Sequence, residues 1–150
     1  MALVLNDEQT MLRDIARGFL AKNAPIAHLR ALRDNRDVDG FSRALWKDFV
    51  EMGWAGILVP QDYGGLGLGH VEAGVVMEEL GRTLTPSPFL STTVLAATAI
   101  ARAGTDKQRR KYLSLIVAGE LIASLAVDET AKHHPEKTAM SAVRAGTASN

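Results

Sequence analysis

The sequence feature that most constrains the fold is a glycine-rich stretch, residues 59–69, reading Val-Pro-Gln-Asp-Tyr-Gly-Gly-Leu-Gly-Leu-Gly. Its glycines let the backbone take positive φ and approach another surface closely. Pro60 fixes φ near the start and removes one backbone donor, which predicts a shaped loop between helices. Neither G-x-G-x-x-G nor G-x-x-x-x-G-K-S/T is present, so a tight connector is favoured over a phosphate cradle.

Composition limits the class of protein. The 150 residues are 47% hydrophobic and 23% charged, which is typical of one soluble globular domain. Seventeen basic and seventeen acidic side chains balance, so no broad field favours nucleic acid. The chain has no cysteine, and its short apolar start shows no basic region or cleavage site. We predict a cytoplasmic protein without a membrane span.

Periodicity and capping signals predict a chain of helices. Asn6 with Gln9, and Thr105 with Gln108, have the spacing of capping boxes. Apolar residues recur every three or four positions after each start. The predicted helices cover residues 7–22, 27–32, 41–52, 70–82, 89–103 and 105–119.

The helix predicted over 89–103 is rich in Ala, Val, Leu and Thr on nearly all sides. Such a helix is typically central and buried, with its hydroxyls bonded back to its own backbone. A cavity-lining helix that offers small side chains to a ligand is the open alternative. In the preceding helix, Glu78 and Glu79 point about 100° apart, which favours an exposed charged shoulder over a catalytic pair.

Residues 121–127 are apolar apart from Ser124 and are flanked by acids, which predicts a buried strand. A lone strand cannot satisfy its backbone groups. It therefore pairs with an extended piece at 54–59, or its partners lie elsewhere. Residues 139–145 are a candidate for one more strand.

A metal pair in the tail is not favoured. Glu129 and His133 have the four-residue spacing of a helical pair, with His134 adjacent. Pro135 follows at once, and no third ligand has a reason to lie near. We predict no metal site, and nothing in the sequence indicates a nucleophilic triad.

Several pieces, in this order, resemble the N-terminal part of the acyl-CoA dehydrogenases. They are the stretch 59–67, Glu-Glu-Leu-Gly-Arg at 78–82, Gly-Thr-Asp-Lys-Gln-Arg-Arg-Lys-Tyr-Leu at 104–113 and Ala-Gly-Glu at 118–120. Each is weak alone, but the order and spacing are specific. The resemblance covers residues 4 to about 128 and implies a mainly α fold. An all-α helical bundle over 1–120 is followed by the first strand or strands of an incomplete middle β-domain over 121–150.

The resemblance also implies an activity. Members of the family bind FAD and form a trans-2 double bond in an acyl-CoA thioester. A glutamate removes the α-proton, and a hydride passes to flavin N5. An electron-transfer flavoprotein usually reoxidises the flavin, and the subunits form homo- or hetero-oligomers, either dimers or tetramers.

Site residues follow from the resemblance position by position. The family's catalytic base belongs to helices beyond Asn150, so we predict no catalytic residue in this chain. Ser91 and Leu95 fall where acyl-pocket residues are expected. Leu125, Val127 and Asp128 fall near positions that touch the flavin ring.

The chain departs from the family after residue 127. The family has a Thr-Glu-Pro or Ser-Glu-Pro there, whereas this chain has Asp128-Glu129-Thr130. An ionised carboxylate does not donate the hydrogen bond that the family's hydroxyl gives. Three hypotheses follow: the N-terminal domain of a dehydrogenase, a non-catalytic subunit of a two-chain enzyme, and a free-standing helical interaction module.

Overall fold

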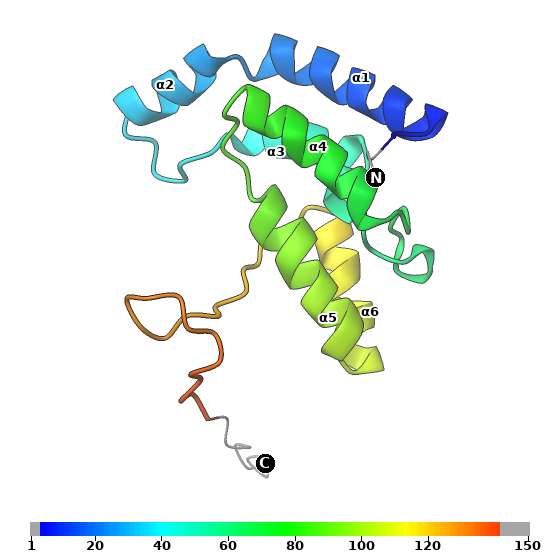
Figure 1. Ribbon diagram of the computed structural model, residues 1–150, viewed down its shortest axis with the longest axis vertical. Helices are drawn as coiled ribbons and strands as arrows, with labels where there is room; N and C mark the ends of the chain where they lie inside the picture. The colour runs from blue at the N-terminus through cyan, green and yellow to red at the C-terminus, as the bar shows by residue number, and fades with distance from the viewer. Residues whose placement is uncertain (1–3, 142–150) are drawn as a thin grey trace.

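The computed structural model describes residues 4–141, and within them the chain is helical with no strand (Figure 1). The predicted mainly α fold is confirmed. The α-helices are α1 (Asp7–Asn23), α2 (Ile26–Asp34), α3 (Arg43–Glu51), α4 (His70–Arg82), α5 (Ala97–Ala103) and α6 (Asp106–Val117). The other helical elements are the 3₁₀ turns η1 (Trp54–Gly56) and η2 (Gln61–Tyr63) and the π-helix η3 (Phe89–Ala96).

Both predicted capping boxes are present. The Asn6 side chain accepts from the Gln9 N–H at 2.8 Å, and the Gln9 side chain accepts from the Asn6 N–H at 3.1 Å. Thr105 and Gln108 make the same exchange at the start of α6. Because orphan amides at a helix start need acceptors, these pairs set where α1 and α6 begin.

The core has two parts, one inside each of two groups of helices (Figure 1). In the upper group α1 and α4 run side by side, with α3 and η1 packed beneath them. An aromatic cluster fills this space: the rings of Phe49 and Trp54 are 5.0 Å apart, and Phe19 meets Trp54 edge-on at 5.8 Å. In the lower group α5 and α6 run side by side around Leu113 and Ile116.

The glycine stretch folds back on the segment that precedes it. Four consecutive amides, 65–68, donate to the carbonyls of Pro60, Gly56, Val59 and Ile57. Gly64 and Gly67 take positive φ, at 86° and 64°. Since these amides are occupied inside the protein, the loop is a connector and does not form a phosphate cradle. The prediction that 54–59 is extended is wrong, because η1 begins there and its carbonyls receive the glycine loop.

Glu79 is the clearest departure in the helical body. The sequence predicts an exposed glutamate here, but the Glu79 side chain is only 1% exposed. Arg17 of α1 donates to both carboxylate oxygens, at 3.1 and 2.8 Å, and Arg82 donates to one of them at 3.2 Å. Glu78 is exposed as predicted, and among the described residues its ion-pair partner is Arg82. The buried carboxylate therefore joins α1 to α4, and the acid is structural.

The helix predicted over 89–103 is continuous but has two geometries. Its first half, η3, is a π-helix, and its second half is α5. It is only partly buried: Phe89, Thr92, Thr93, Ala96 and Ala97 face the core, whereas Leu90 and Leu95 are 48% and 41% exposed. The prediction of an all-round buried helix is wrong on the face that carries these leucines.

Residues 121–128, which we call the exit segment, are extended but do not form the predicted buried strand. Ile122, Leu125 and Val127 are exposed. The residues 54–59 are not its partner, since their carbonyls serve the glycine loop. A strand needs a neighbour for its ladder, and the described part of the chain offers none. Of the candidate strand 139–145, residues 142–145 lie outside the described residues.

Candidate functional site

The two pocket residues inferred from the resemblance lie on η3. Leu95 is 41% exposed, and Ser91 is partly exposed, with its hydroxyl donating to the Pro88 carbonyl at 3.2 Å. Spaced four residues apart, they share one side of the π-helix. Leu90, also on η3, adds a second exposed leucine that the sequence analysis did not select. This face is apolar with one hydroxyl, which suits the wall of an acyl pocket.

Two threonines next to Ser91 hold η3 in place. Both Thr92 and Thr93 are fully buried. Thr93 donates to the Ala55 carbonyl of η1 at 3.1 Å, while Thr92 bonds to Ala123 of the exit segment. The expectation that these hydroxyls bond their own helix holds for Ser91 and fails for both threonines. Spacing gives no signal for such long-range bonds.

The three proposed flavin-contacting residues lie on the exit segment, two to five positions after Ala123. Leu125 and Val127 are each 44% exposed. Figure 1 shows this part of the chain leaving the helical body, so the two side chains are free to cover an apolar ring. The structure brings their segment to η3 through Thr92, although it records no direct bond between the two sets of site residues.

Asp128 is held by its own tail. Its carboxylate pairs with His133 Nδ1 at 3.0 Å and accepts from the His134 N–H at 3.1 Å. The hydrogen bond with the His133 side chain lowers the pKa of Asp128 below its ordinary value, with help from the His134 amide. Leu125 and Val127 offer exposed apolar side chains, which suit contact with an apolar ring. An ionised Asp128 does not fit the role of hydrogen-bond donor.

The other tail residues weighed as metal ligands have separate partners. Glu129 accepts from the backbone of Ala139 and Met140, and His134 Nδ1 lies 3.0 Å from Glu136. Within residues 4–141, no group of three or more histidines and acids is arranged to hold a metal ion.

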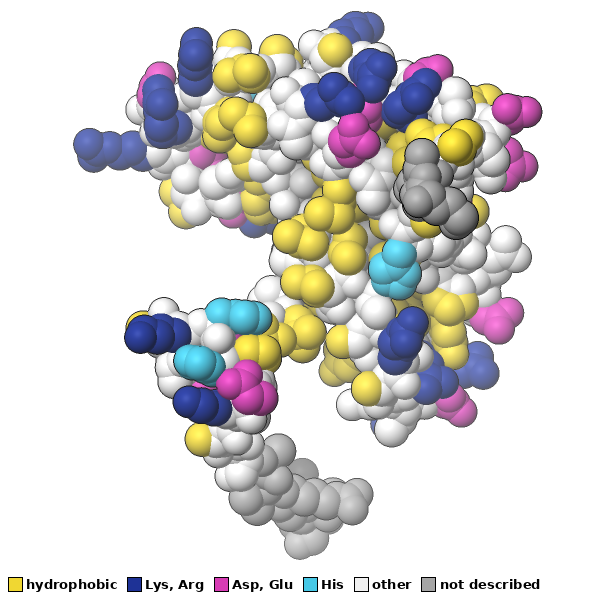
Figure 2. All heavy atoms as spheres, viewed as in Figure 1, with side chains coloured by type: hydrophobic (Ala, Val, Ile, Leu, Met, Phe, Trp, Pro, Cys, Tyr) yellow, Lys and Arg dark blue, Asp and Glu magenta, His cyan; other side chains and the backbone are white. Residues whose placement is uncertain are grey.

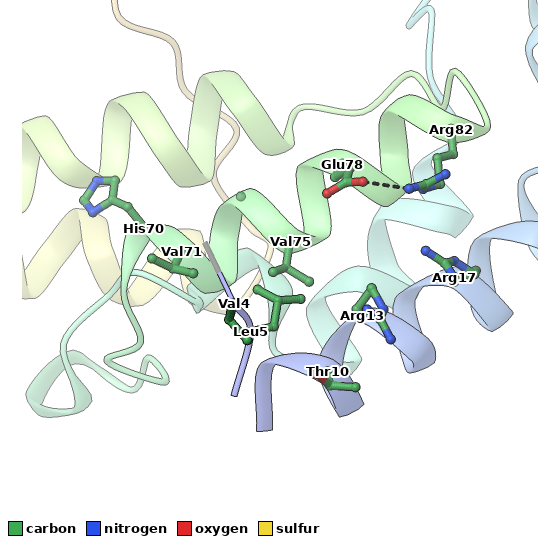
Figure 3. A pocket seen from close by; sticks show the side chains of 11 residues that line it. Val4, Leu5, Thr10, Arg13, Arg17, His70, Val71, Val75, Glu78 and Arg82 are labelled. Atoms are coloured by element: carbon green, nitrogen blue, oxygen red, sulfur yellow. Dashed lines mark hydrogen bonds and ion pairs between the residues drawn. The ribbon is translucent and has the colours of Figure 1, made fainter. Parts of the chain in front are cut away.

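A groove of about 890 Å³ lies between α1 and α4, on the face opposite the core (Figure 3). Arg13, Arg17 and Arg82 border its charged end, and Val71 and Val75 lie along its apolar side. Each guanidinium is already paired with an acid of the same region: Asp14, Glu79, or Glu78 and Glu79 together. The groove therefore has no excess positive charge to select an anion.

Exposed hydrophobic side chains form an apolar surface that no other described part of the chain covers. Figure 2 shows such side chains gathered over the middle of one face. On η3 and the exit segment the exposed ones are Leu90, Leu95, Ile122, Leu125 and Val127. No helix in the described residues has the length and apolar character needed to cross a membrane.

Comparison with known families matches this architecture. The sequence model described as acyl-CoA dehydrogenase, N-terminal domain, matches residues 6–120. The chain belongs to the acyl-CoA dehydrogenase family. Among curated relatives of the family, acyl-CoA dehydrogenase IpdE2 of Mycobacterium tuberculosis is 35% identical over 124 residues, which are 81% of this chain and 37% of that protein.

Solved structures of the family are similar as well. The ChsE4–ChsE5 complex from Mycobacterium tuberculosis gives a TM-score of 0.78 at 26% identity, over 89% of this chain and 36% of that one. An acyl-CoA dehydrogenase complexed with FAD from Bacillus anthracis gives 0.66 at 27% identity, over 79% of this chain and 20% of that one. The chain thus spans between 20% and 37% of the length of these family members.

Proposed function

We propose that residues 1–120 are the N-terminal helical domain of an FAD-dependent acyl-CoA dehydrogenase, and that residues 121–150 begin its middle β-domain. The observation that carries the proposal is the family match over 6–120, after which the exit segment leaves the helices with its apolar side chains uncovered. An exposed apolar surface of this kind marks a face that another domain or subunit covers.

The reaction proposed for the assembled enzyme is α,β-dehydrogenation of an acyl-CoA thioester. Bound FAD would accept the hydride, and a glutamate supplied from outside this chain would remove the α-proton. The chain's own contribution is binding: the η3 face with Ser91 and Leu95 forms part of the acyl-pocket wall. An apolar wall excludes water, which strengthens electrostatic interactions around the reacting carbons.

Leu95→Trp is expected to change substrate use without unfolding the protein. Because Leu95 is already 41% exposed, a larger side chain meets little of the helical core. In the assembled enzyme it would narrow the pocket and lower kcat/KM for long acyl chains about tenfold or more relative to short ones. Steady-state kinetics over a chain-length series measures this ratio. Ile15→Trp, on the exposed side of α1, is the matched control and should leave the ratio unchanged.

The proposed partners are an acyl-CoA substrate, an electron-transfer flavoprotein and further dehydrogenase subunits in a homo- or hetero-oligomer. The uncovered face with Leu90, Ile122 and Val127 supports the subunit contact. The similarity to a complex of two differently named chains supports a hetero-oligomer in particular.

The chemistry of Asp128 supports a second candidate function, in which this chain is a subunit whose own flavin site is incomplete. Its lowered pKa keeps it ionised, so it cannot give the hydrogen bond that the family's hydroxyl gives. In that case the purified oligomer should contain only half as many flavins as N-terminal domains. Flavin absorbance and quantitative amino-acid analysis give the ratio, and one flavin for every N-terminal domain in the oligomer would exclude the second candidate.

The proposed activity is tested by turnover. Protein purified with all of its co-assembling chains is mixed with acyl-CoA thioesters and an artificial electron acceptor. Mass spectrometry should detect a trans-2-enoyl-CoA two hydrogens lighter than the substrate. Acceptor reduction without an enoyl product, or no reduction with any acyl-CoA, would contradict the proposal.

A further inference from the structure

We propose that Thr92 is a positioning residue, one that sets the flavin-contacting exit segment against the acyl-pocket helix η3. The inference rests on the proposed function, because it concerns the same site. In this proposal, the buried Thr92 hydroxyl fixes the position of Leu125 and Val127 relative to Ser91 and Leu95.

The geometry of the contact is reciprocal. Thr92 Oγ1 donates to the Ala123 carbonyl at 2.8 Å and accepts from the Ala123 N–H at 3.0 Å. A hydroxyl has one donor and two acceptor positions, so a single side chain satisfies both backbone groups of one residue. Thr92 thereby takes the place of a neighbouring strand at this position.

Beyond Leu121, Ala123 is the one described residue of the exit segment that is hydrogen-bonded to the helical body. After Leu121, whose N–H donates to the Leu115 carbonyl at 3.2 Å, the bonds at Ala123 are the last that the described part of the exit segment makes to the helical body. The bonds of Asp128 go to the tail itself. Where the exit segment lies on η3 is therefore decided at Thr92.

The local helix geometry makes this use of a threonine possible. In a regular helix, threonine usually bonds a carbonyl three or four residues earlier, as Ser91 does with Pro88. Thr92 lies in a π-helical stretch, a geometry that recurs at functional sites, and its hydroxyl reaches out to another segment. Thr93 bonds η1 instead, so adjacent hydroxyls fix η3 to the body and the exit segment to η3.

The position of the contact suits a role in catalysis. Leu125 follows Ala123 by two residues, about 7 Å of extended chain, and Ser91 and Leu95 flank Thr92 on η3. A shift at Ala123 therefore moves the flavin-contacting residues relative to the substrate wall. Reaction geometry is sensitive to such shifts, since a misplacement of about 1 Å can cost about a hundredfold in rate.

Three variants of the flavin-loaded holoenzyme test the inference. Thr92→Val removes the hydroxyl and keeps the branched shape; Thr92→Ser keeps the hydroxyl; Thr93→Val removes the neighbouring hydroxyl that bonds η1. We expect Thr92→Val to lower kcat about tenfold or more, shift the flavin absorption band and speed hydrogen exchange at the Ala123 amide. Thr92→Ser should recover most of kcat, and Thr93→Val should leave hydrogen exchange at the Ala123 amide unchanged, because that amide bonds Thr92 and not Thr93.

The outcomes separate the two proposals. Faster exchange at Ala123 in Thr92→Val with unchanged kcat and flavin spectrum would overturn the positioning role and leave the proposed function standing. Equally fast exchange at the Ala123 amide in Thr93→Val would also overturn it, because the effect would then be general to η3. A wild-type enzyme without flavin or acyl-CoA turnover would remove the proposed function, and this inference with it.

Discussion

Glu79→Ala is expected to lower the free energy of unfolding by about 2–3 kcal/mol. The substitution removes a buried carboxylate that receives hydrogen bonds from Arg17 and Arg82 and so joins α1 to α4. Removing one partner of a fully buried pair costs about 3–5 kcal/mol, because a buried charge is left alone. Here both guanidiniums left behind are about half exposed and can be rehydrated, which reduces the cost below that range.

Glu78→Ala is the matched control. The two glutamates are neighbours and share Arg82, but the Glu78 side chain is 65% exposed. An exposed ion pair contributes at most about 1 kcal/mol, so this variant should stay within about 0.5 kcal/mol of the wild type. Urea denaturation measures both. Equal effects of the two substitutions would contradict the structural role assigned to Glu79.

The contribution of Glu79 should depend on pH. Hydrogen bonds from Arg17 hold the pKa of the Glu79 carboxyl below its ordinary value in the folded protein. A lowered folded-state pKa gives stability that is present above the unfolded-state pKa, about 4.3, and is lost as the pH falls through the folded value. The difference in stability between wild type and Glu79→Ala should therefore be full at neutral pH and shrink below about pH 4.

Gly65→Ala should destabilise the protein by about 3 kcal/mol or more. A Cβ at this position would overlap the Val59 carbonyl and lie 2.5 Å from the Val59 Cβ. Val59 is fully buried, and its carbonyl also accepts from the Gly67 amide, so neither group can move without opening the loop. Thermal unfolding should show the loss as a clearly lower Tm.

Gly74→Ala is the opposite case and serves as the control. Gly74 lies inside α4, and a Cβ there would meet nothing within 4 Å. Because glycine costs about 0.5–1 kcal/mol relative to alanine in a helix interior, this variant should be slightly more stable than the wild type. A neutral Gly65→Ala would contradict the close packing of the glycine loop on Val59.

The helices were predictable because each is specified locally. A few adjacent residues specify each helix start, as in the Asn6–Gln9 and Thr105–Gln108 capping boxes, and the apolar periodicity that follows is equally local. The glycine loop was predictable for the same reason, since its proline and glycines restrict the backbone directly. Element order and spacing then sufficed for the family resemblance.

The contacts that join these elements were not predictable from local pattern. Glu79 and Arg17 are 62 positions apart, and Thr92 and Ala123 are 31 apart. Nothing in a helix periodicity shows which glutamate of an adjacent pair will meet an arginine of another helix. The prediction of a buried strand in the exit segment was wrong for a related reason. Its apolar composition predicts burial, whereas Leu125 and Val127 lie exposed.

The visible absorption spectrum of the purified protein, with the intact mass of every chain in the sample, tests the central claim most directly. We expect a flavin spectrum that bleaches when an acyl-CoA is added without oxygen. A colourless sample that contains this chain and all of its co-purifying partners would contradict the claim that it serves a flavin-dependent acyl-CoA dehydrogenase. A flavin band that no acyl-CoA bleaches would contradict the proposed reaction.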